Sequence, residues 1–331
     1  MKSAHRYQRL TIAVLLVFSI AALGLSLLIG SVSIVWNDLI SFFRSGTVSM
    51  TTMVVLELRL PRAFSAFVVG SSLAVAGVMM QVLLRNPLAD PYVLGVSGGS
   101  AAFALIVMLL GFPFSAVPIA ATIGAGFSIV LLILLARTSG DWGSSRLLLT
   151  GIVLASGWGA LIGFFLSLGE ANQIQGMLFW LMGDLRPEWP GFIRVFVLLA
   201  VLIAGFIVAR DLDLLLEGDL RARSLGLNTS ALRLIILLAA SLLTAASVTL
   251  AGPVGFIGLV VPHMMRLIIG SRHRLLIPVS ALAGGTLLVI AEMIARTVIA
   301  PQQLPVGVIT SFIGVPVFLY LLRRRGLSIS S

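Results

Sequence analysis

The sequence has no cysteine, and its only lysine is Lys2. The lack of cysteine excludes disulfides, thiolate metal sites and cysteine nucleophiles, and it leaves the redox compartment undetermined. The lack of any further lysine excludes a phosphate-binding loop, which needs a lysine within Gly-x4-Gly-Lys-Ser/Thr to reach the terminal phosphates. The glycines at 95–100 have no lysine after them and predict tight helix packing instead. We therefore expect that this chain is not an enzyme and does not hydrolyse ATP.

Charged residues are also scarce. They make up 10% of the 331 residues, and hydrophobic residues make up 59%, whereas a soluble domain is about 25% charged. Because each bilayer crossing needs about 20 mainly apolar residues, we expect an all-α polytopic membrane protein with about ten transmembrane helices in one domain, residues 1–331. The expected spans are 11–30, 62–84, 92–110, 116–136, 147–168, 191–209, 234–251, 254–270, 276–298 and 305–322.

The first span follows a basic start and so has the order of a secretory signal peptide. Its apolar run, 11–30, is longer than the about 7–15 residues of a signal core, and no Ala-x-Ala cleavage site follows it. We expect a retained helix.

The net charge of +10 comes from basic residues scattered between the apolar runs, which argues against a nucleic-acid-binding face. An excess of Lys and Arg on the cytoplasmic side is the usual topology signal. With an even number of spans, both termini are then expected in the cytoplasm. The basic residues expected there are Lys2, Arg6, Arg9, Arg85, Arg137, Arg146, Arg210, Arg221, Arg223, Arg233, Arg266, Arg272, Arg274, Arg323, Arg324 and Arg325.

Two segments are too polar or too short to cross the membrane. Residues 210–233 carry mixed charge, leucines at helical spacing and a Gly-Leu-Asn break, which predicts two short helices at the cytoplasmic surface. Residues 169–190 have a short apolar middle with aromatic residues, which is typical of an interfacial helix. Small residues four apart at Gly159 and Gly163 predict close helix packing.

The ionisable residues inside the apolar runs are few. The histidines His5, His263 and His273 are dispersed, with no pair at metal-ligand spacing, so we expect no metal site and a structural, hydrogen-bonded role for His263. Glu292 is expected at membrane depth, where a carboxylate is a functional candidate. An ion pair with Arg296, one helical turn away, is the equally weighted alternative.

Arg59, Arg62 and Arg296 are expected on the outer face, against the general bias of the positive charges. Arginines there can dock an acidic partner through bidentate contacts to carboxylates. They can also be anchors that reach the headgroup layer. The residues alone leave both interpretations open.

Several motifs, in this order along the chain, resemble the permease family of ABC importers for ferric siderophores, haem and cobalamin, the FecCD and BtuC type. The similarity covers nearly the whole chain. The motifs are residues 58–62 (LRLPR), 85–91 (RNPLADP), 94–97 (LGVS), 145–149 (SRLLL), 180–183 (WLMG), 222–227 (ARSLGL), 255–263 (GFIGLVVPH) and 305–308 (PVGV).

The resemblance implies a type II ABC importer permease fold in the inner membrane. It implies a homodimer with a central pathway, two cytoplasmic ATPase subunits that use ATP, a periplasmic binding protein and no cofactor on this chain. The implied site residues are Arg59, Arg62 and Arg296 for docking; Glu217, Arg221, Ala222, Leu225 and Gly226 for ATPase coupling; and Asn86, Leu88, Ser144 and Ser145 for the cytoplasmic gate.

The expected function is ATP-driven import of an iron chelate, a ferric siderophore or haem, by alternating access. Cobalamin is the alternative cargo, and an oxyanion such as molybdate is a more distant one. A gradient-driven secondary carrier is the rival class, and it would need ion-coordinating groups near the midplane, for which Glu292 is thin support. A membrane-embedded enzyme would need a nucleophile and base, and no recognisable spacing of such residues occurs.

Overall fold

The computed structural model of the protein describes residues 2–30, 34, 36–46, 48–136 and 144–326. These residues are mostly helical, and no strand occurs among them. The elements are α1 Lys2–Leu28, α2 Trp36–Ser45, α3 Met50–Met53, the π-helical turn η1 Val54–Arg59, α4 Leu60–Leu83, the 3-10 turn η2 Pro91–Leu94, α5 Val96–Leu109, the 3-10 turn η3 Phe114–Ala116, α6 Val117–Ala136, α7 Ser144–Leu168, α8 Ala171–Leu181, α9 Phe192–Ile207, α10 Ala209–Leu216, α11 Asp219–Ser224, α12 Thr229–Ala251, α13 Ile257–Ile269, α14 His273–Thr297 and α15 Val306–Gly326.

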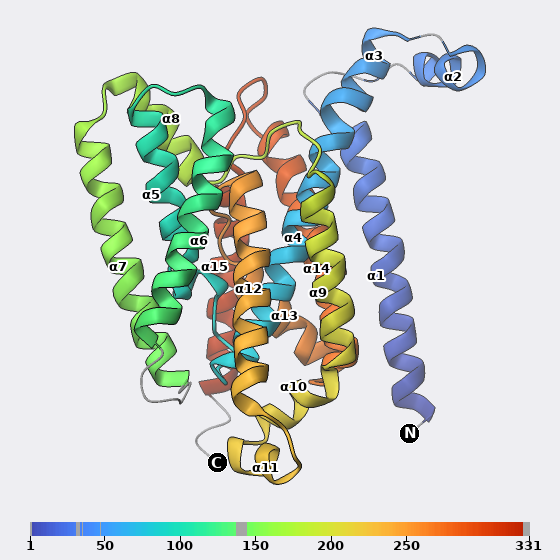
Figure 1. Ribbon diagram of the computed structural model, residues 1–331. Coiled ribbons are helices and arrows are strands. Elements are labelled where there is room, and N and C mark those ends of the chain that lie inside the picture. The colour runs from blue at the N-terminus through green and yellow to red at the C-terminus, as the bar shows by residue number, and fades with distance from the viewer. Residues whose placement is uncertain (1, 31–33, 35, 47, 137–143, 327–331) are drawn as a thin grey trace.

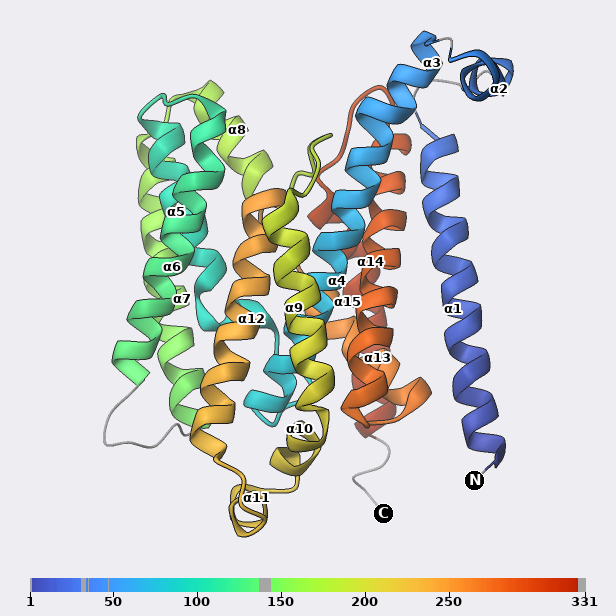
Figure 2. The same ribbon diagram turned by 45° about the vertical axis from the view of Figure 1, so that its right-hand side comes forward.

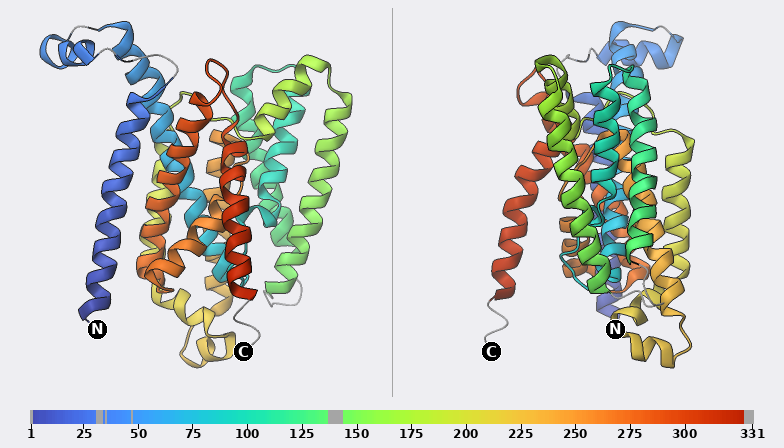
Figure 3. Two further views of the ribbon diagram at one scale, coloured as in Figure 1. Left: turned by 180° about the vertical axis from the view of Figure 1, so that it is seen from behind. Right: turned by 60° about the vertical axis from the view of Figure 1, so that its left-hand side comes forward.

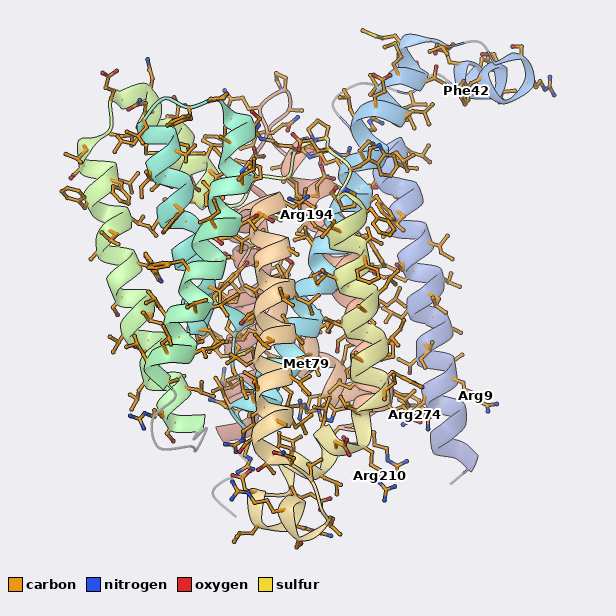
Figure 4. All side chains as sticks on the ribbon, in the orientation of Figure 1. Arg9, Phe42, Met79, Arg194, Arg210 and Arg274 are labelled. Carbon is orange, nitrogen blue, oxygen red and sulfur yellow. The ribbon has the colours of Figure 1, made fainter. Side chains whose placement is uncertain are left out.

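The long helices stand side by side in one bundle, with α10 and α11 at one end and α2, α3 and α8 at the other (Figure 1). The start of α1 and the end of α15 lie at the α11 end. Figure 4 shows Arg9, Arg210 and Arg274 at this end and Arg194 near the opposite one. The arrangement agrees with the expected separation of basic residues, and the side of the membrane that each end faces stays a prediction.

The helices coincide with the expected spans. Six helices of the described residues are long and apolar enough to cross a membrane, or seven if α9 and α10, which meet at a bend of 64°, form one span. Three shorter apolar helices, α5, α13 and α15, occupy the remaining expected spans. The helical membrane class is confirmed. The number of ten spans stays a prediction, because three of the helices are too short to establish it.

The two surface segments have the expected form. Residues 210–233 contain the short helices α10 and α11 before α12 begins, and residues 169–190 contain α8. Sequence analysis missed α2, an outer helix that lies apart from the bundle (Figure 1). Its ten residues include Asp38 and Arg44, so it forms no apolar run of the length for which the spans were searched.

The bundle is built around α4. Within the continuous helix that ends with α4, 94% of the most apolar stretch is buried inside the protein. α4 packs against α14, α12 and α13, and α1 packs on α14 at one edge of the bundle (Figure 2). Gly70 lies against the carbonyl group of Gly284, and Gly77 lies against that of Gly258. Such contacts require glycine, because a β-carbon would overlap the neighbouring backbone.

The other glycine predictions have different outcomes. A β-carbon on Gly99 would lie 2.6 Å from the carbonyl oxygen of Gly124, so the glycines at 95–100 do pack tightly, with α5 on α6. At Gly159 and Gly163 a β-carbon would meet no atom within 4 Å. Among the described residues, no helix packs on this face of α7, and the close packing predicted there does not occur between these residues.

We expect Gly77→Ala to destabilise the bundle, because the methyl group would strike the backbone of Gly258 rather than a mobile side chain. Overpacking of this kind costs about 1–3 kcal/mol. Size-exclusion chromatography of heated, detergent-solubilised protein should show a lower unfolding midpoint. Gly126→Ala in α6, where the added methyl group meets no atom within 4 Å, is the control and should leave the midpoint unchanged. Equal midpoints for the two variants would contradict the packing described here.

Candidate docking, coupling and gate sites

A cluster of charged side chains, which we call the outer cluster after the predicted orientation, lies at the end of the bundle opposite α11, where α4 begins and α14 ends. Glu292 is fully buried there, and its Oε1 lies 2.8 Å from Nε of Arg62. Its Oε2 lies 3.6 Å from Nε of Arg296, one turn further along α14. The expected ion pair of Glu292 with Arg296 is therefore present, and Arg62 is a second cationic partner that sequence analysis did not find.

Two arginines at this end of the bundle, Arg59 and Arg296, also bind the end of α1. Arg59 donates from one terminal nitrogen to the carbonyl oxygens of Leu27 and Leu28, each at 2.9 Å, and Arg296 donates to the carbonyl oxygen of Ser26. The last carbonyl groups of a helix have no partner within it and carry the negative end of its dipole. The carbonyl groups at the end of α1 therefore act as acceptors for the guanidinium groups of the cluster, which outnumber the carboxylate of Glu292. Arg62 also donates to Oε1 of Gln303 at 2.6 Å.

The structure thus brings together the three arginines predicted to dock a partner, but it buries them. Their exposed fractions are 4% for Arg59, 8% for Arg62 and 6% for Arg296. Glu292 and the end of α1 draw the side chains inward in this arrangement. The outer-face location and the docking role of the three arginines stay predictions.

The predicted coupling residues lie on or beneath α11. Glu217 and Arg221 form an exposed ion pair at 2.9 Å. Gly226 has a φ of +84°, a left-handed conformation that glycine adopts without strain and that turns the chain toward α12. Ala222 is fully buried, so it packs α11 onto its neighbours, and its coupling role stays a prediction.

Two leucines project from this segment. Leu225, which was predicted, is 61% exposed, and Leu220, which was not, is 89% exposed. A leucine within the charged run GDLRAR was the signal available in the sequence. Together with Glu217 and Arg221, these leucines form a mixed apolar and charged surface that we call the α11 surface.

The neighbouring helix α10 is held to α14. Oδ1 of Asp213 lies 2.5 Å from Nδ1 of His273 and accepts a hydrogen bond from its backbone N–H at 3.1 Å. Burial alone would raise the pKa of Asp213, but hydrogen bonds and charge from His273, with the charge of Arg272, outweigh it and lower the pKa. Sequence analysis gave His273 no role because its partner is 60 residues away.

The predicted gate residues Asn86 and Leu88 lie in the break between α4 and η2. Oδ1 of Asn86 accepts the backbone N–H of Leu88 at 2.9 Å, which closes a tight turn. Ser145 is exposed in the first turn of α7, and the side chain of Ser144 lies outside the described residues. α7 does pack against η2, where Gly151 lies against the carbonyl group of Val93.

A largely apolar cavity of about 660 Å³ opens between α8, the connection before α13, and α15. Tyr92 anchors its wall, since its hydroxyl group donates to the carbonyl oxygen of Val254 at 3.0 Å and accepts the N–H of the same residue at 2.8 Å. Gly307, Ser311 and Phe312 of α15 line the opposite side. α15 lies on the outside of the bundle (Figure 3), and so the cavity is not closed by this chain.

The described residues contain no candidate metal site. Within the described residues, no three His, Asp or Glu side chains are grouped so that they could hold a metal ion. His263 is buried in α13 and is not part of such a group.

The chain is similar to known proteins over nearly its whole length. The model of the FecCD transport family matches residues 15–324. The Fe(3+) dicitrate transport system permease protein FecD of Escherichia coli is 39% identical, over 95% of this chain and 99% of the relative. The vitamin B12 import system permease protein BtuC of Vibrio cholerae is 41% identical, over 84% and 85%. The hemin transport system permease protein HmuU of Yersinia pestis is 40% identical, over 82% and 83%.

The fold is also found in solved structures. One described as an inward-facing conformation of an ABC transporter of the metal-chelate type superposes with a TM-score of 0.82 and 25% sequence identity. The alignment covers 96% of this chain and 99% of the other.

We expect Glu292→Gln to destabilise the protein strongly, because three neighbouring guanidinium groups would lose their one anionic partner. Breaking a buried pair in this way costs about 3–5 kcal/mol. The thermal unfolding midpoint in detergent measures the effect. Glu57→Gln, an exposed carboxylate in η1 near the same end of the bundle, is the matched control and should be neutral. An unchanged midpoint for Glu292→Gln would show that the carboxylate does not hold the cluster together.

Proposed function

Because the chain belongs to the FecCD transport family, we propose that this permease subunit of an ABC importer moves an iron chelate, a ferric siderophore or haem, into the cytoplasm. The observation that carries the proposal is the end-to-end match to a ferric dicitrate permease, which covers 95% of this chain and 99% of the relative. The cargo itself is the inferred part. Cobalamin is the alternative, since the vitamin B12 permease is equally similar at 41% identity.

We propose that two copies of the chain form the pathway between them. The open face of α7, with Gly159 and Gly163, offers the small-residue surface on which a helix of a second copy can pack closely. α15 exposes Phe312 and Leu319 beside the cavity of about 660 Å³. A second copy on this side would close the cavity into a passage lined mainly by apolar groups, suited to a large chelate that the permease binds weakly.

The α11 surface is the proposed seat for an ATPase subunit, one for each copy. Leu220 and Leu225 are large apolar side chains in an aqueous segment, and anchors of this type dominate protein interfaces when they enter a pocket. Glu217 and Arg221 would form a polar rim around them. ATP binding and hydrolysis then take place on the partner subunit, which accords with the absence of a phosphate-binding loop in this chain.

The outer cluster is the proposed dock for a periplasmic binding protein. Three arginines against one glutamate leave the cluster positively charged, which favours approach of an acidic surface. In this state the charge is met by carbonyl groups at the end of α1. We propose that carboxylates of the partner replace those carbonyls on docking, since a charged acceptor forms the stronger hydrogen bond.

Alternating access follows from these parts. The loaded binding protein would dock at the outer cluster, and closure of the two ATPases on ATP would move the α11 surfaces and, through them, the break at Asn86 and Leu88. Only a differential preference of ATP and binding protein for distinct states of the permease can drive this cycle. A secondary carrier is disfavoured because Glu292 pairs with Arg62 and Arg296 and lies near the end of α14 rather than at its middle, whereas such carriers use groups near the midplane.

Uptake into vesicles tests the function directly. With the permease and its ATPase in the membrane and binding protein outside, we expect a labelled ferric siderophore or haem to accumulate only when ATP is inside. Accumulation of cobalamin instead would replace the proposed cargo. Equal accumulation with and without ATP would contradict the importer function and favour a gradient-driven carrier.

The ATPase seat is tested by Leu220→Ser combined with Leu225→Ser. Loss of two interface anchors should raise the Kd for the ATPase at least about tenfold, since truncating one such anchor costs about 2 kcal/mol or more. Pull-down or biolayer interferometry in detergent measures the Kd. Leu110→Ser, which changes an exposed leucine directly after α5, is the control. If the double variant binds the ATPase with wild-type affinity, the ATPase does not bind through the α11 surface.

A further inference from the structure

Three charged side chains from distant parts of the chain meet where α11 begins. Asp219 is the first residue of α11, and its Oδ1 lies 2.5 Å from a terminal nitrogen of Arg85. Both of its carboxylate oxygens lie 2.9 Å from a terminal nitrogen of Arg233, in the first turns of α12. We call these three residues the Asp219 junction. It connects the α11 surface to the segment that leaves α4.

Arg233 fixes Asp219 to the bundle. Its side chain is only 5% exposed, whereas that of Asp219 is 33% exposed. A largely buried guanidinium group requires an anionic partner, because desolvation of the charge is otherwise uncompensated. Asp219 therefore cannot leave Arg233 without a large cost in free energy, and a displacement of α11 must either move α12 with it or strain this pair.

Arg85, which directly precedes the predicted gate residue Asn86, binds both α10 and α11. Its Nε donates to the carbonyl oxygen of Leu215 in α10 at 3.2 Å, in addition to the contact with Asp219. Its backbone has a φ of +47°, in the left-handed region that a residue with a β-carbon rarely adopts. Strained conformations of this type persist only where the surroundings hold them. The contacts of the Arg85 side chain are such a constraint, and they act on the residue directly before Asn86.

We propose that Asp219 and Arg85 are positioning residues that transmit displacement of α11 to the gate. The inference rests on the proposed function, in which α11 receives the ATPase. When α11 moves, the contact of Asp219 with Arg85 moves or releases the strained backbone at residue 85, and the turn closed by Asn86 and Leu88 follows.

Two other acidic residues of the segment 210–233, Glu217 and Asp213, do not connect it to the predicted gate. Glu217 pairs with Arg221, four residues away in the same segment, and Asp213 binds His273 at the start of α14. Neither contact reaches the break between α4 and η2. Of the ion pairs described for this segment, the one at Asp219 reaches the residue that precedes the predicted gate.

The absence of cysteine allows a direct test. Leu88→Cys introduces one attachment site per copy without other substitutions, and a spin label on it reports the distance between the two gate segments of the assembled importer. The complex with its ATPase is studied in nanodiscs by double electron–electron resonance, without nucleotide and with ATP and vanadate. ATP hydrolysis, ATPase binding and uptake per ATP are measured on the same variants with Leu88 retained, because Leu88 is itself a predicted gate residue.

In the otherwise unsubstituted Leu88→Cys complex we expect a nucleotide-dependent change in the label distance. Arg85→Ala leaves the Asp219 pair with Arg233 intact, so it should fold and bind the ATPase normally while the distance change is lost and uptake per ATP falls at least tenfold. Asp219→Glu, which keeps the charge, should restore part of the response that Asp219→Ala loses. Asp211→Asn on α10, for which no ion pair occurs among the described residues, is the matched control.

A normal distance change and normal uptake in Arg85→Ala would overturn the inference. Loss of ATPase binding in Arg85→Ala would also overturn it, since the residue would then act in assembly rather than in transmission. Absence of ATP-driven uptake of all three cargoes by the complex of the unsubstituted chain, which retains Leu88, would refute the proposed function, and the inference with it. The two failures are thus distinguished by the response of the complex that retains Asp219 and Arg85.

Discussion

The close packing of α4 against α14 and α13 is the interaction on which the other features depend. Gly70 and Gly77 place the backbone of α4 directly against neighbouring carbonyl groups, and the helix is buried for most of its length. Both ends of this helix then carry charge. Arg62 belongs to the outer cluster, and Arg85 follows the last turn and belongs to the Asp219 junction. The two regions proposed to bind partner proteins are therefore attached to one buried helix.

The two charged clusters follow one electrostatic pattern. Each has more arginines than carboxylates, with Glu292 at the outer end and Asp219 at the other. In each, one guanidinium group also donates to carbonyl oxygens in the last turn of a helix, those of α1 for Arg59 and that of α10 for Arg85. Helix ends thus supply acceptors to both clusters, because their terminal carbonyls have no partner in the helix.

Features that depend on local sequence were predictable. Apolar runs located the membrane helices, and the charged segment 210–233 gave the two short helices that the structure contains. Contacts between distant residues were not predictable from local sequence, since Arg62 pairs with Glu292 across 230 positions and Arg85 pairs with Asp219 across 134. The resemblance to permeases singled out Arg59 and Arg62, but only the packed structure shows that their side chains turn inward. Leu220 was missed because the helical spacing of the leucines in this segment does not by itself distinguish an exposed leucine from a buried one.

The attachment of α1 bears on how the chain is assembled during synthesis. α1 is translated before the other helices of the bundle, yet it packs mainly on α14, and Arg296 of α14 binds the carbonyl oxygen of Ser26 in its last turn. Most of the remaining surface of α1 is exposed. Translation must therefore pass the end of α14 at Thr297 before α1 meets the surface that holds it. Until then, the hydrophobicity of α1 keeps it in the membrane, and the hydrogen bonds from Arg59 connect it to the start of α4.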